Sequence, residues 1–100
     1  MANKLFIYGT LANPEIQKEV LGRVIKGIPD VLRGYERSEI AIDGETYPLI
    51  IPSKAGKVDG LMIEVTNDEL KKIDQYETDA YKREQVFLES GVFAWVYIKR

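Results

Sequence analysis

Histidine and cysteine are both missing from this chain of 100 residues. Their absence excludes Ser–His and Cys–His nucleophilic arrangements, disulfide bonds and cysteine-based zinc sites. A metal ion would have to be bound by oxygen ligands alone, and the acidic residues do not follow the spacing of an EF-hand. If the protein is an enzyme, proton transfer must therefore fall to Glu, Asp, Lys, Tyr, Ser or Thr.

Long apolar runs and blocks of like charge are missing as well. The longest apolar runs, Leu5–Tyr8 and Val92–Ile98, fall far short of the roughly 20 residues that a membrane span needs. The 14 Lys and Arg residues are dispersed among 16 Asp and Glu residues, for a net charge of −2, which argues against nucleic acid as the main partner. Four residues precede the first apolar run, so we predict no signal peptide, no membrane partner and a cytoplasmic location.

The composition is that of a globular protein, with 45% hydrophobic and 30% charged residues. A chain of this length buries roughly 60–70% of the surface that it exposes when unfolded, which is enough for one modest core. We therefore predict a single domain over residues 1–100. The oligomeric state cannot be read from the pattern.

The N-terminal pattern predicts a buried strand followed by a capped helix. Lys4–Tyr8 is short and apolar, as expected of a buried strand. Asn13 is a favourable N-cap, and Pro14 suits the first helical position. The helix is expected to run to about Leu21 and to stop at Gly22.

The rest of the chain predicts further strands and a second helix. Asn67 is the expected N-cap of this helix, which should run to about Tyr76 or Glu77. Residues 24–29 are ambiguous, and Gly34 suggests a bulge. One strand is expected from about Asp30. Four more are expected over Tyr47–Pro52, Val58–Val65, Tyr81–Glu89 and Val92–Ile98. Turns are expected at Asp43-Gly44, Lys54–Lys57 and Ser90-Gly91.

The element order is therefore β-α-β-β-β-α-β-β. It predicts an α+β fold with a small mixed, mostly antiparallel curled sheet or barrel and two main helices. In the last strand both alternating faces are apolar, so this strand should be covered on both sides.

The first candidate site is the loop formed by Tyr8, Gly9, Thr10 and Leu11. A loop between a strand and a helix presents backbone N–H groups without acceptors, and the helix dipole favours an anion there. Gly9 would let a ligand approach the backbone closely. The alternative is that Gly9 merely ends the strand while Asn13 merely caps the helix.

The second candidate is the carboxyl group of Glu77. On a helical wheel Glu77 lies within roughly 20° of Leu70, on the apolar face that also carries Ile73. A carboxyl group that points toward the core has a raised pKa, as proton transfer at neutral pH requires. The alternatives are a frayed helix end with Glu77 in solvent, or a structural ion pair between Glu77 and Arg83.

Leu5-Phe6-Ile7-Tyr8-Gly9-Thr10-Leu11 resembles the opening of the gamma-glutamylcyclotransferase-like family, also called AIG2-like. The match continues in order with Tyr47-Pro48, Val58-Asp59-Gly60-Leu61, Ile73-Asp74-Gln75-Tyr76-Glu77, Tyr81, Arg83 and Ala94-Trp95-Val96-Tyr97. The Asp-x-Tyr-Glu and Tyr-x-Arg set is the more specific part, and the resemblance covers nearly the whole chain. The Thr10-Leu11 version of the loop is similar to that of short prokaryotic members and of members that act on gamma-glutamylamines.

This resemblance implies a reaction without a metal or cofactor. It implies that the loop from Tyr8 to Leu11 binds the α-amino and α-carboxylate end of a gamma-glutamyl group and that Glu77 is the general acid/base. Tyr47, Tyr81 and Arg83 are further candidate substrate-binding residues. The implied substrate is a gamma-glutamyl amide or amine, which would give 5-oxoproline and the free amine.

Two other functions stay open at this point. The same residues would serve a non-catalytic module that binds a glutamate-like metabolite. Alternatively, the chain would be an interaction protein that binds its partner through its acidic surface or a strand edge, and its pocket would have no role.

Overall fold

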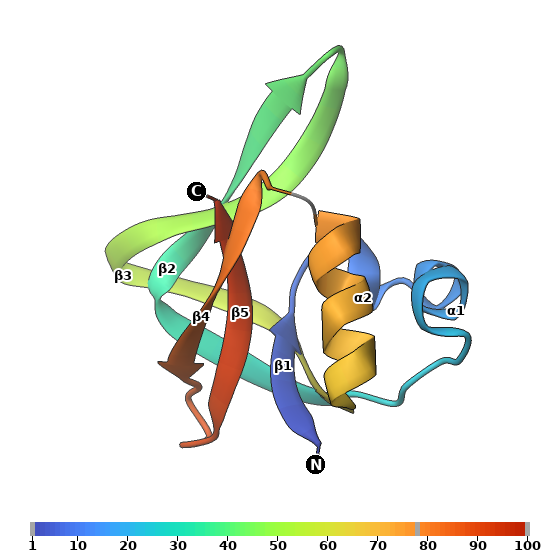
Figure 1. Ribbon diagram of the computed structural model, residues 1–100. Helices are drawn as coiled ribbons and strands as arrows, with labels where there is room; N and C mark the ends of the chain where they lie inside the picture. The colour runs from blue at the N-terminus through green and yellow to red at the C-terminus, as the bar shows by residue number, and fades with distance from the viewer. Residues whose placement is uncertain (1, 78, 100) are drawn as a thin grey trace.

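The computed structural model describes residues 2–77 and 79–99, which form a curled sheet with two α-helices beside it (Figure 1). The sheet has the strand order β2-β3-β1-β5-β4, with β1 and β5 parallel and the other neighbours antiparallel. The predicted α+β class with a mixed, mostly antiparallel curled sheet is therefore confirmed. The elements are β1 (Asn3–Ile7), the 3-10 helix η1 (Thr10–Ala12), α1 (Pro14–Leu21), β2 (Ile28–Ile42), β3 (Glu45–Val65), α2 (Asn67–Glu77), β4 (Tyr81–Phe87) and β5 (Phe93–Lys99).

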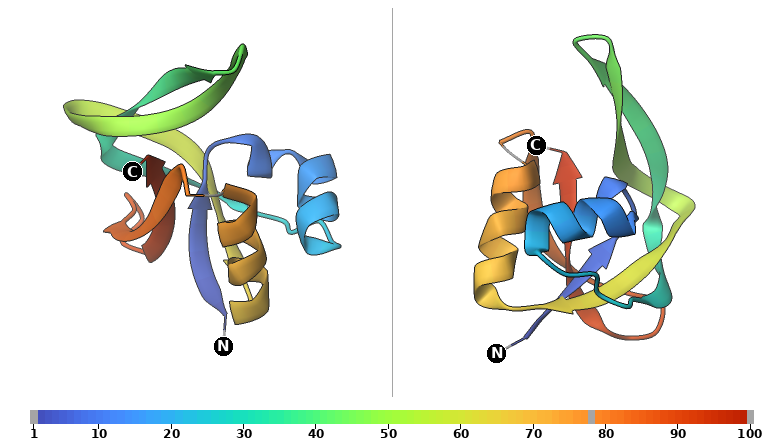
Figure 2. Two further views of the ribbon diagram at one scale, coloured as in Figure 1. Left: turned by 45° about the horizontal axis from the view of Figure 1, so that its top comes forward. Right: turned by 90° about the vertical axis from the view of Figure 1, so that its right-hand side faces the viewer.

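Strand β1 lies in the middle of the sheet and contributes to two separate apolar clusters. Leu5 and Ile7 belong to the cluster that contains Ile73 of α2, so this face of the sheet is covered by the helices. Phe6 and Tyr8 point the opposite way, into a second cluster that the sheet encloses by curling (Figure 2). Because successive side chains of β1 point to opposite faces of the sheet, this one strand contributes to both apolar clusters.

Helix α1 has the predicted ends. The side chain of Asn13 accepts a hydrogen bond of 2.9 Å from the backbone N–H of Glu15, and Pro14 is the first helical residue. Gly22 ends the helix with a φ of 78°, the left-handed conformation that glycine adopts without steric cost. Local capping chemistry is sufficient to place this helix.

The predicted cap of α2 is wrong by one residue. The N-cap is Thr66 rather than Asn67, because Thr66 and Glu69 form a reciprocal capping box: the N–H of Thr66 donates to Glu69 Oε1 at 2.9 Å, and the N–H of Glu69 donates to Thr66 Oγ1 at 3.1 Å. The helix ends at Glu77, as expected. Among the described residues, no helix has the length and apolar character to cross a membrane.

Strands β2 and β3 form a long hairpin whose tip projects beyond the rest of the sheet (Figures 1 and 2). The chain reverses at Asp43-Gly44, as predicted, and both residues have positive φ angles of 51° and 80°. We call the part of this hairpin from residue 36 to residue 51 the hairpin arm.

The predicted turn at Lys54–Lys57 is wrong. The expected strands Tyr47–Pro52 and Val58–Val65 are parts of the single strand β3, so the structure has one strand fewer than predicted. The register shifts between Arg33 and Tyr35, where Gly34 has a φ of 89°. A Cβ on Gly56 would lie 2.4 Å from the carbonyl oxygen of Tyr35. These glycines therefore serve a bulge within a strand pair, where backbones pass very closely, rather than a reversal of the chain.

The last two strands are joined by a slightly longer loop than predicted. Strand β4 ends at Phe87 and β5 begins at Phe93, and the N–H of Leu88 donates to the carbonyl oxygen of Val92 at 2.8 Å. Gly91 takes the left-handed conformation in the loop, with a φ of 90°. Strand β5 is covered on both sides, as predicted: Tyr97 belongs to the helix-covered cluster, and Ala94 and Val96 belong to the enclosed one.

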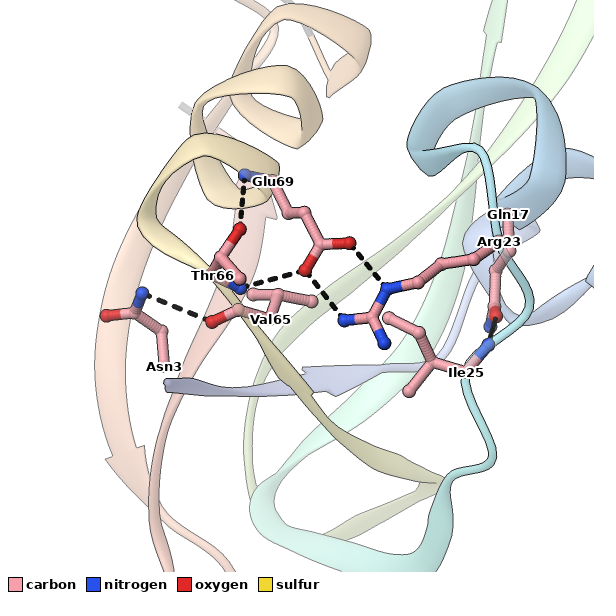
Figure 3. A network of polar contacts seen from close by, with 7 residues as sticks. All are labelled: Asn3, Gln17, Arg23, Ile25, Val65, Thr66 and Glu69. Atoms are coloured by element: carbon pink, nitrogen blue, oxygen red, sulfur yellow. Dashed lines mark hydrogen bonds and ion pairs between the residues drawn. The ribbon is translucent and has the colours of Figure 1, made fainter. Parts of the chain in front are cut away.

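An ion pair between the two helical segments fixes the start of α2 (Figure 3). The guanidinium of Arg23, just after α1, donates to both carboxylate oxygens of Glu69, at 2.7 and 2.8 Å. The hydrogen bond from Arg23, together with the hydrogen bonds from Thr66, lowers the pKa of Glu69 from 4.5 to about 2, despite the cost of burial.

We expect Glu69→Gln to lower the free energy of unfolding by about 1–2 kcal/mol at pH 7, because the ion pair is lost while the shape is kept. The folded-state pKa of Glu69 lies below its usual value, so this contribution is fully present above about pH 4.5 and is lost as the pH falls toward 2. Urea unfolding at pH 7 and pH 3 measures the difference, which should shrink at pH 3. The exposed Glu64→Gln is the control, and an equal loss for both variants would contradict the account.

Candidate active site

A cavity of about 510 Å³ opens where the ends of several elements meet. Its walls come from the end of β1 and the following loop, the end of α2, the start of β4, the end of β5 and the hairpin arm. These segments are far apart in the sequence, so the cavity is a product of the strand order and not of one local motif.

The glycine loop forms one wall. Gly9 is the N-cap residue of η1 without a side-chain capping bond, and the N–H groups of Thr10 and Leu11 are the first of that helix, which itself offers them no acceptor. Leu11 is buried, and Gly9 and Thr10 line the cavity. The start of η1 therefore leaves backbone N–H donors without an intrahelical acceptor at the wall that Gly9 and Thr10 form.

Glu77 is the last residue of α2 and lines the same cavity. Its side chain is half-buried, and burial raises its pKa from 4.5 to about 7. A carboxyl group with this pKa exchanges its proton readily near neutral pH, which is the property that general acid/base catalysis needs.

Tyrosine hydroxyl groups surround this acid and join the elements to one another. The hydroxyl of Tyr8 donates to the carbonyl oxygen of Tyr97 at 2.6 Å, and that of Tyr81 donates to the carbonyl oxygen of Pro48 at 2.8 Å. Burial, and to a smaller extent the charge of Glu77, raises the pKa of all three tyrosines. These residues therefore stay neutral at physiological pH.

A hydrogen bond also ties the glycine loop to α2. The hydroxyl groups of Thr10 and Tyr76 lie 2.7 Å apart, one residue before the acid. This bond holds the end of α2 against the loop. It therefore helps to determine where Glu77 lies relative to the loop.

The hairpin arm forms another wall of the cavity. Ile40, Ile42 and Tyr47 line it from the arm. Arg37 donates to the carbonyl oxygen of Tyr8, and a Cβ on Gly9 would lie only 3.2 Å from Pro48 Cγ. Gly9 thus has a packing role in addition to any ligand contact, because it lets the arm seat closely on the loop.

The structure brings together most of the residues singled out in the sequence. The cavity is lined by Tyr8, Gly9, Thr10, Leu11, Tyr47, Glu77 and Tyr81. Arg83 is not among the lining residues. Its guanidinium donates to both carboxylate oxygens of Asp74, at 2.7 and 3.0 Å, and lies 4.5 Å from the centre of the Trp95 ring.

Sequence reasoning missed several lining residues. Tyr97 and Lys99 reach the cavity because the end of β5 pairs with the start of β4, and Ile40 and Ile42 reach it because the hairpin arm curves over it. Tyr76 and Tyr97 stand in motifs quoted for the family resemblance, and that was the available signal for these two. Ile40, Ile42 and Lys99 depend on long-range pairing that no local pattern reports.

The sequence and the fold match known proteins over nearly the whole chain. Residues 5–100 match the family model described as "Gamma-glutamyl cyclotransferase, AIG2-like". The AIG2-like protein C of Arabidopsis thaliana is 40% identical over 86 residues, which make up 85% of this chain and 49% of that protein. The chain spans about half the length of the curated relatives it matches.

Solved structures share the same fold. A solution structure from Arabidopsis thaliana superposes with a TM-score of 0.84 at 30% identity, over 99% of this chain and 62% of that one. A structure of a gamma-glutamyl cyclotransferase superposes with a TM-score of 0.83 at 13% identity, over 100% of this chain and 68% of that one. At that identity the second likeness shows the fold alone.

We expect Glu77→Gln to stabilise the protein at pH 8 and to leave it nearly unchanged at pH 4. The folded-state pKa is above the usual value, so ionised Glu77 costs stability once the pH exceeds about 4.5, and the cost reaches its full size above about 7. The gain at pH 8 should be about 1–3 kcal/mol in urea unfolding. An equal change in the free energy of unfolding at both pH values would show that the pKa of Glu77 is not raised in the folded protein.

Proposed function

Because the chain belongs to the gamma-glutamyl cyclotransferase, AIG2-like family, we propose that it converts a gamma-glutamyl amide or amine to 5-oxoproline and the free amine. The observation that carries this proposal is the half-buried carboxyl group of Glu77, with a pKa near 7, in the cavity that the glycine loop lines. The family supplies the class of reaction, and the cavity supplies a group that suits it.

In the proposed reaction the substrate provides its own nucleophile. Its α-amino nitrogen, in the neutral form, attacks the γ-carbonyl carbon, and the new carbon–nitrogen bond closes a five-membered ring. The bond from that carbon to the leaving nitrogen then breaks. The carboxylate of Glu77 takes the proton that the attacking nitrogen loses and gives a proton to the leaving nitrogen, so the acid returns to its starting state.

The glycine loop would hold the α-carboxylate of the gamma-glutamyl group. The N–H groups of Thr10 and Leu11 and the hydroxyl of Thr10 are suitable donors for a carboxylate. Fixing this end of the substrate brings the nitrogen near the carbon that it attacks, which lowers the entropic part of the barrier.

The tyrosines and the hairpin arm would complete the binding site. Tyr47 and Tyr81 line the cavity from the arm and from β4, and they would limit the access of water to the reacting groups. Tyr8 connects the loop to β5 through its hydroxyl, so it would keep the loop at a fixed distance from the acid. We assign no substrate contact to Arg83, because it does not line the cavity and its Nε and Nη2 atoms donate to Asp74.

Release of 5-oxoproline from a panel of gamma-glutamyl compounds tests the proposal. We expect the wild type to turn over at least one member and Glu77→Gln to be slower by a factor of about 10²–10⁴, the usual contribution of a general acid/base. The rate at low substrate concentration should rise with pH through about 7, as the Glu77 carboxyl group ionises.

The exposed Asp68→Asn, on the same helix, is the matched control and should keep the wild-type rate. Equal turnover by the wild type and Glu77→Gln would remove Glu77 from the mechanism. Saturable binding of a glutamate-like ligand without product from any compound would instead identify a binding module.

A further inference from the structure

The hairpin arm forms a wall of the cavity, yet it stands apart from the other strands (Figures 1 and 2). Within residues 2–77 and 79–99, the strands of the arm pair only with each other, residues 36–42 with residues 45–51. Strand β1 instead pairs with residues 61–65 of β3. The position of the arm at the cavity therefore depends on side-chain contacts and not on a shared ladder of backbone hydrogen bonds.

Arg37 is the arm residue that reaches the glycine loop. It lies directly opposite Ile50 in the pairing of β2 with β3, so the two side chains leave the same face of the arm. Ile50 is buried in the enclosed apolar cluster that also contains Tyr8, so this face is turned toward the body of the protein. The Nη2 atom of Arg37 donates to the carbonyl oxygen of Tyr8. Because the donor is charged, this hydrogen bond is stronger than one between neutral groups.

The carbonyl group of Tyr8 is an acceptor that the sheet leaves open. The pairing of β1 with β3 ends at Ile7, and its pairing with β5 ends at Phe6. Arg37 therefore supplies a donor to the first carbonyl group beyond both ladders. In the part of the chain that the structure describes, Arg37 takes part in none of the ion pairs and does not line the cavity. Its guanidinium thus serves the loop and not a surface ion pair.

This hydrogen bond restrains the peptide group at which the glycine loop begins. The Tyr8–Gly9 peptide is trans, so its N–H points away from the carbonyl oxygen that the arm holds. Gly9 has no Cβ, and the peptide groups on its two sides rotate more freely than they would beside another residue. With the carbonyl oxygen held by Arg37, that rotation is restricted. The first N–H groups of η1 then keep one orientation relative to the cavity.

We propose that Arg37 is a positioning residue, which holds the glycine loop in the conformation that binds a carboxylate and so makes ligand binding depend on the seating of the hairpin arm. This inference rests on the proposed function for the identity of the group that the loop binds. Arg37 acts through the carbonyl group of Tyr8 and needs no contact with the substrate or with Glu77. Because such coupling is reciprocal, a ligand on the loop in turn holds the arm in place.

Binding of 5-oxoproline and of L-glutamate, measured by isothermal titration calorimetry, tests this role without requiring turnover. Both probes carry the carboxylate that the loop is proposed to bind. We expect Arg37→Met to weaken binding by about tenfold, as for the loss of one hydrogen bond to a charged group. Arg37→Lys keeps a positively charged donor and should stay within about threefold of the wild type. In turnover, Arg37→Met should raise KM while kcat stays nearly the same, because Arg37 does not touch the reacting groups.

Amide hydrogen exchange separates positioning from a general loss of structure. Either probe should slow exchange in residues 36–51 of the wild type, and this protection should be absent in Arg37→Met. Arg33→Met is the matched control, because Arg33 also lies on β2 but donates to Glu89 at 2.7 Å, before the bulge and away from the loop. This control should keep both the affinity and the protection. Arg37 is exposed, so its variants should fold, and the exchange of the wild-type arm tests the coupling without any substitution.

Several results would overturn the assignment. Equal affinities of the wild type and Arg37→Met, no binding of either probe to the wild type, or an arm whose exchange does not respond to the probes would each exclude it. Binding by Arg37→Lys as weak as that by Arg37→Met would exclude it as well. The proposed function is judged separately by 5-oxoproline release from the wild type. Probe binding that depends on Arg37, without product from any gamma-glutamyl compound, would support the role of Arg37 and exclude the reaction.

Discussion

The site depends on one half-buried carboxyl group, that of Glu77, which forms no ion pair among the residues that the structure describes. Glu77 and Asp74 lie one turn apart on α2, and the guanidinium of Arg83 forms its two hydrogen bonds with Asp74. Because Arg83 is held there and over Trp95, Glu77 experiences burial without charge compensation, and its pKa rises to about 7. Two acids one turn apart on α2 therefore differ in character: Asp74 forms a structural ion pair, whereas Glu77 has the pKa of a group that exchanges protons near neutral pH.

The fold keeps this acid in place from both ends of its helix. At the start of α2, Glu69 takes part both in the capping box with Thr66 and in the ion pair with Arg23. At the end, the hydroxyl of Tyr76 meets that of Thr10 in the glycine loop. Between these anchors Ile73 packs into the cluster that covers β1. The acid and the loop therefore belong to one rigid arrangement, which is what preorganised chemistry requires.

The sequence predicts those features that local chemistry determines. The cap and stop of α1, the turn at Asp43-Gly44 and the two apolar faces of β5 each follow from a few adjacent residues. The bulge predicted at Gly34 is confirmed, whereas the turn predicted at Lys54–Lys57 is wrong, because the close backbone approach that requires Gly56 comes from another strand. Likewise, the loop and Glu77 could be singled out from local patterns and a family motif, whereas Lys99 enters the cavity through the pairing of β4 with β5. Arg83 pairs with Asp74 and not with Glu77, and this depends on side-chain geometry that helical spacing does not determine.

A direct pH titration of the Glu77 side-chain carboxyl carbon by ¹³C NMR tests the central claim. Selective labelling of glutamate, with Glu77→Gln to assign the signal, isolates this one group. The account predicts a midpoint near pH 7, well above the usual value of 4.5. A midpoint at or below the usual value would show that the acid is hydrated or ion-paired, and it would contradict the role in proton transfer on which the proposed chemistry depends.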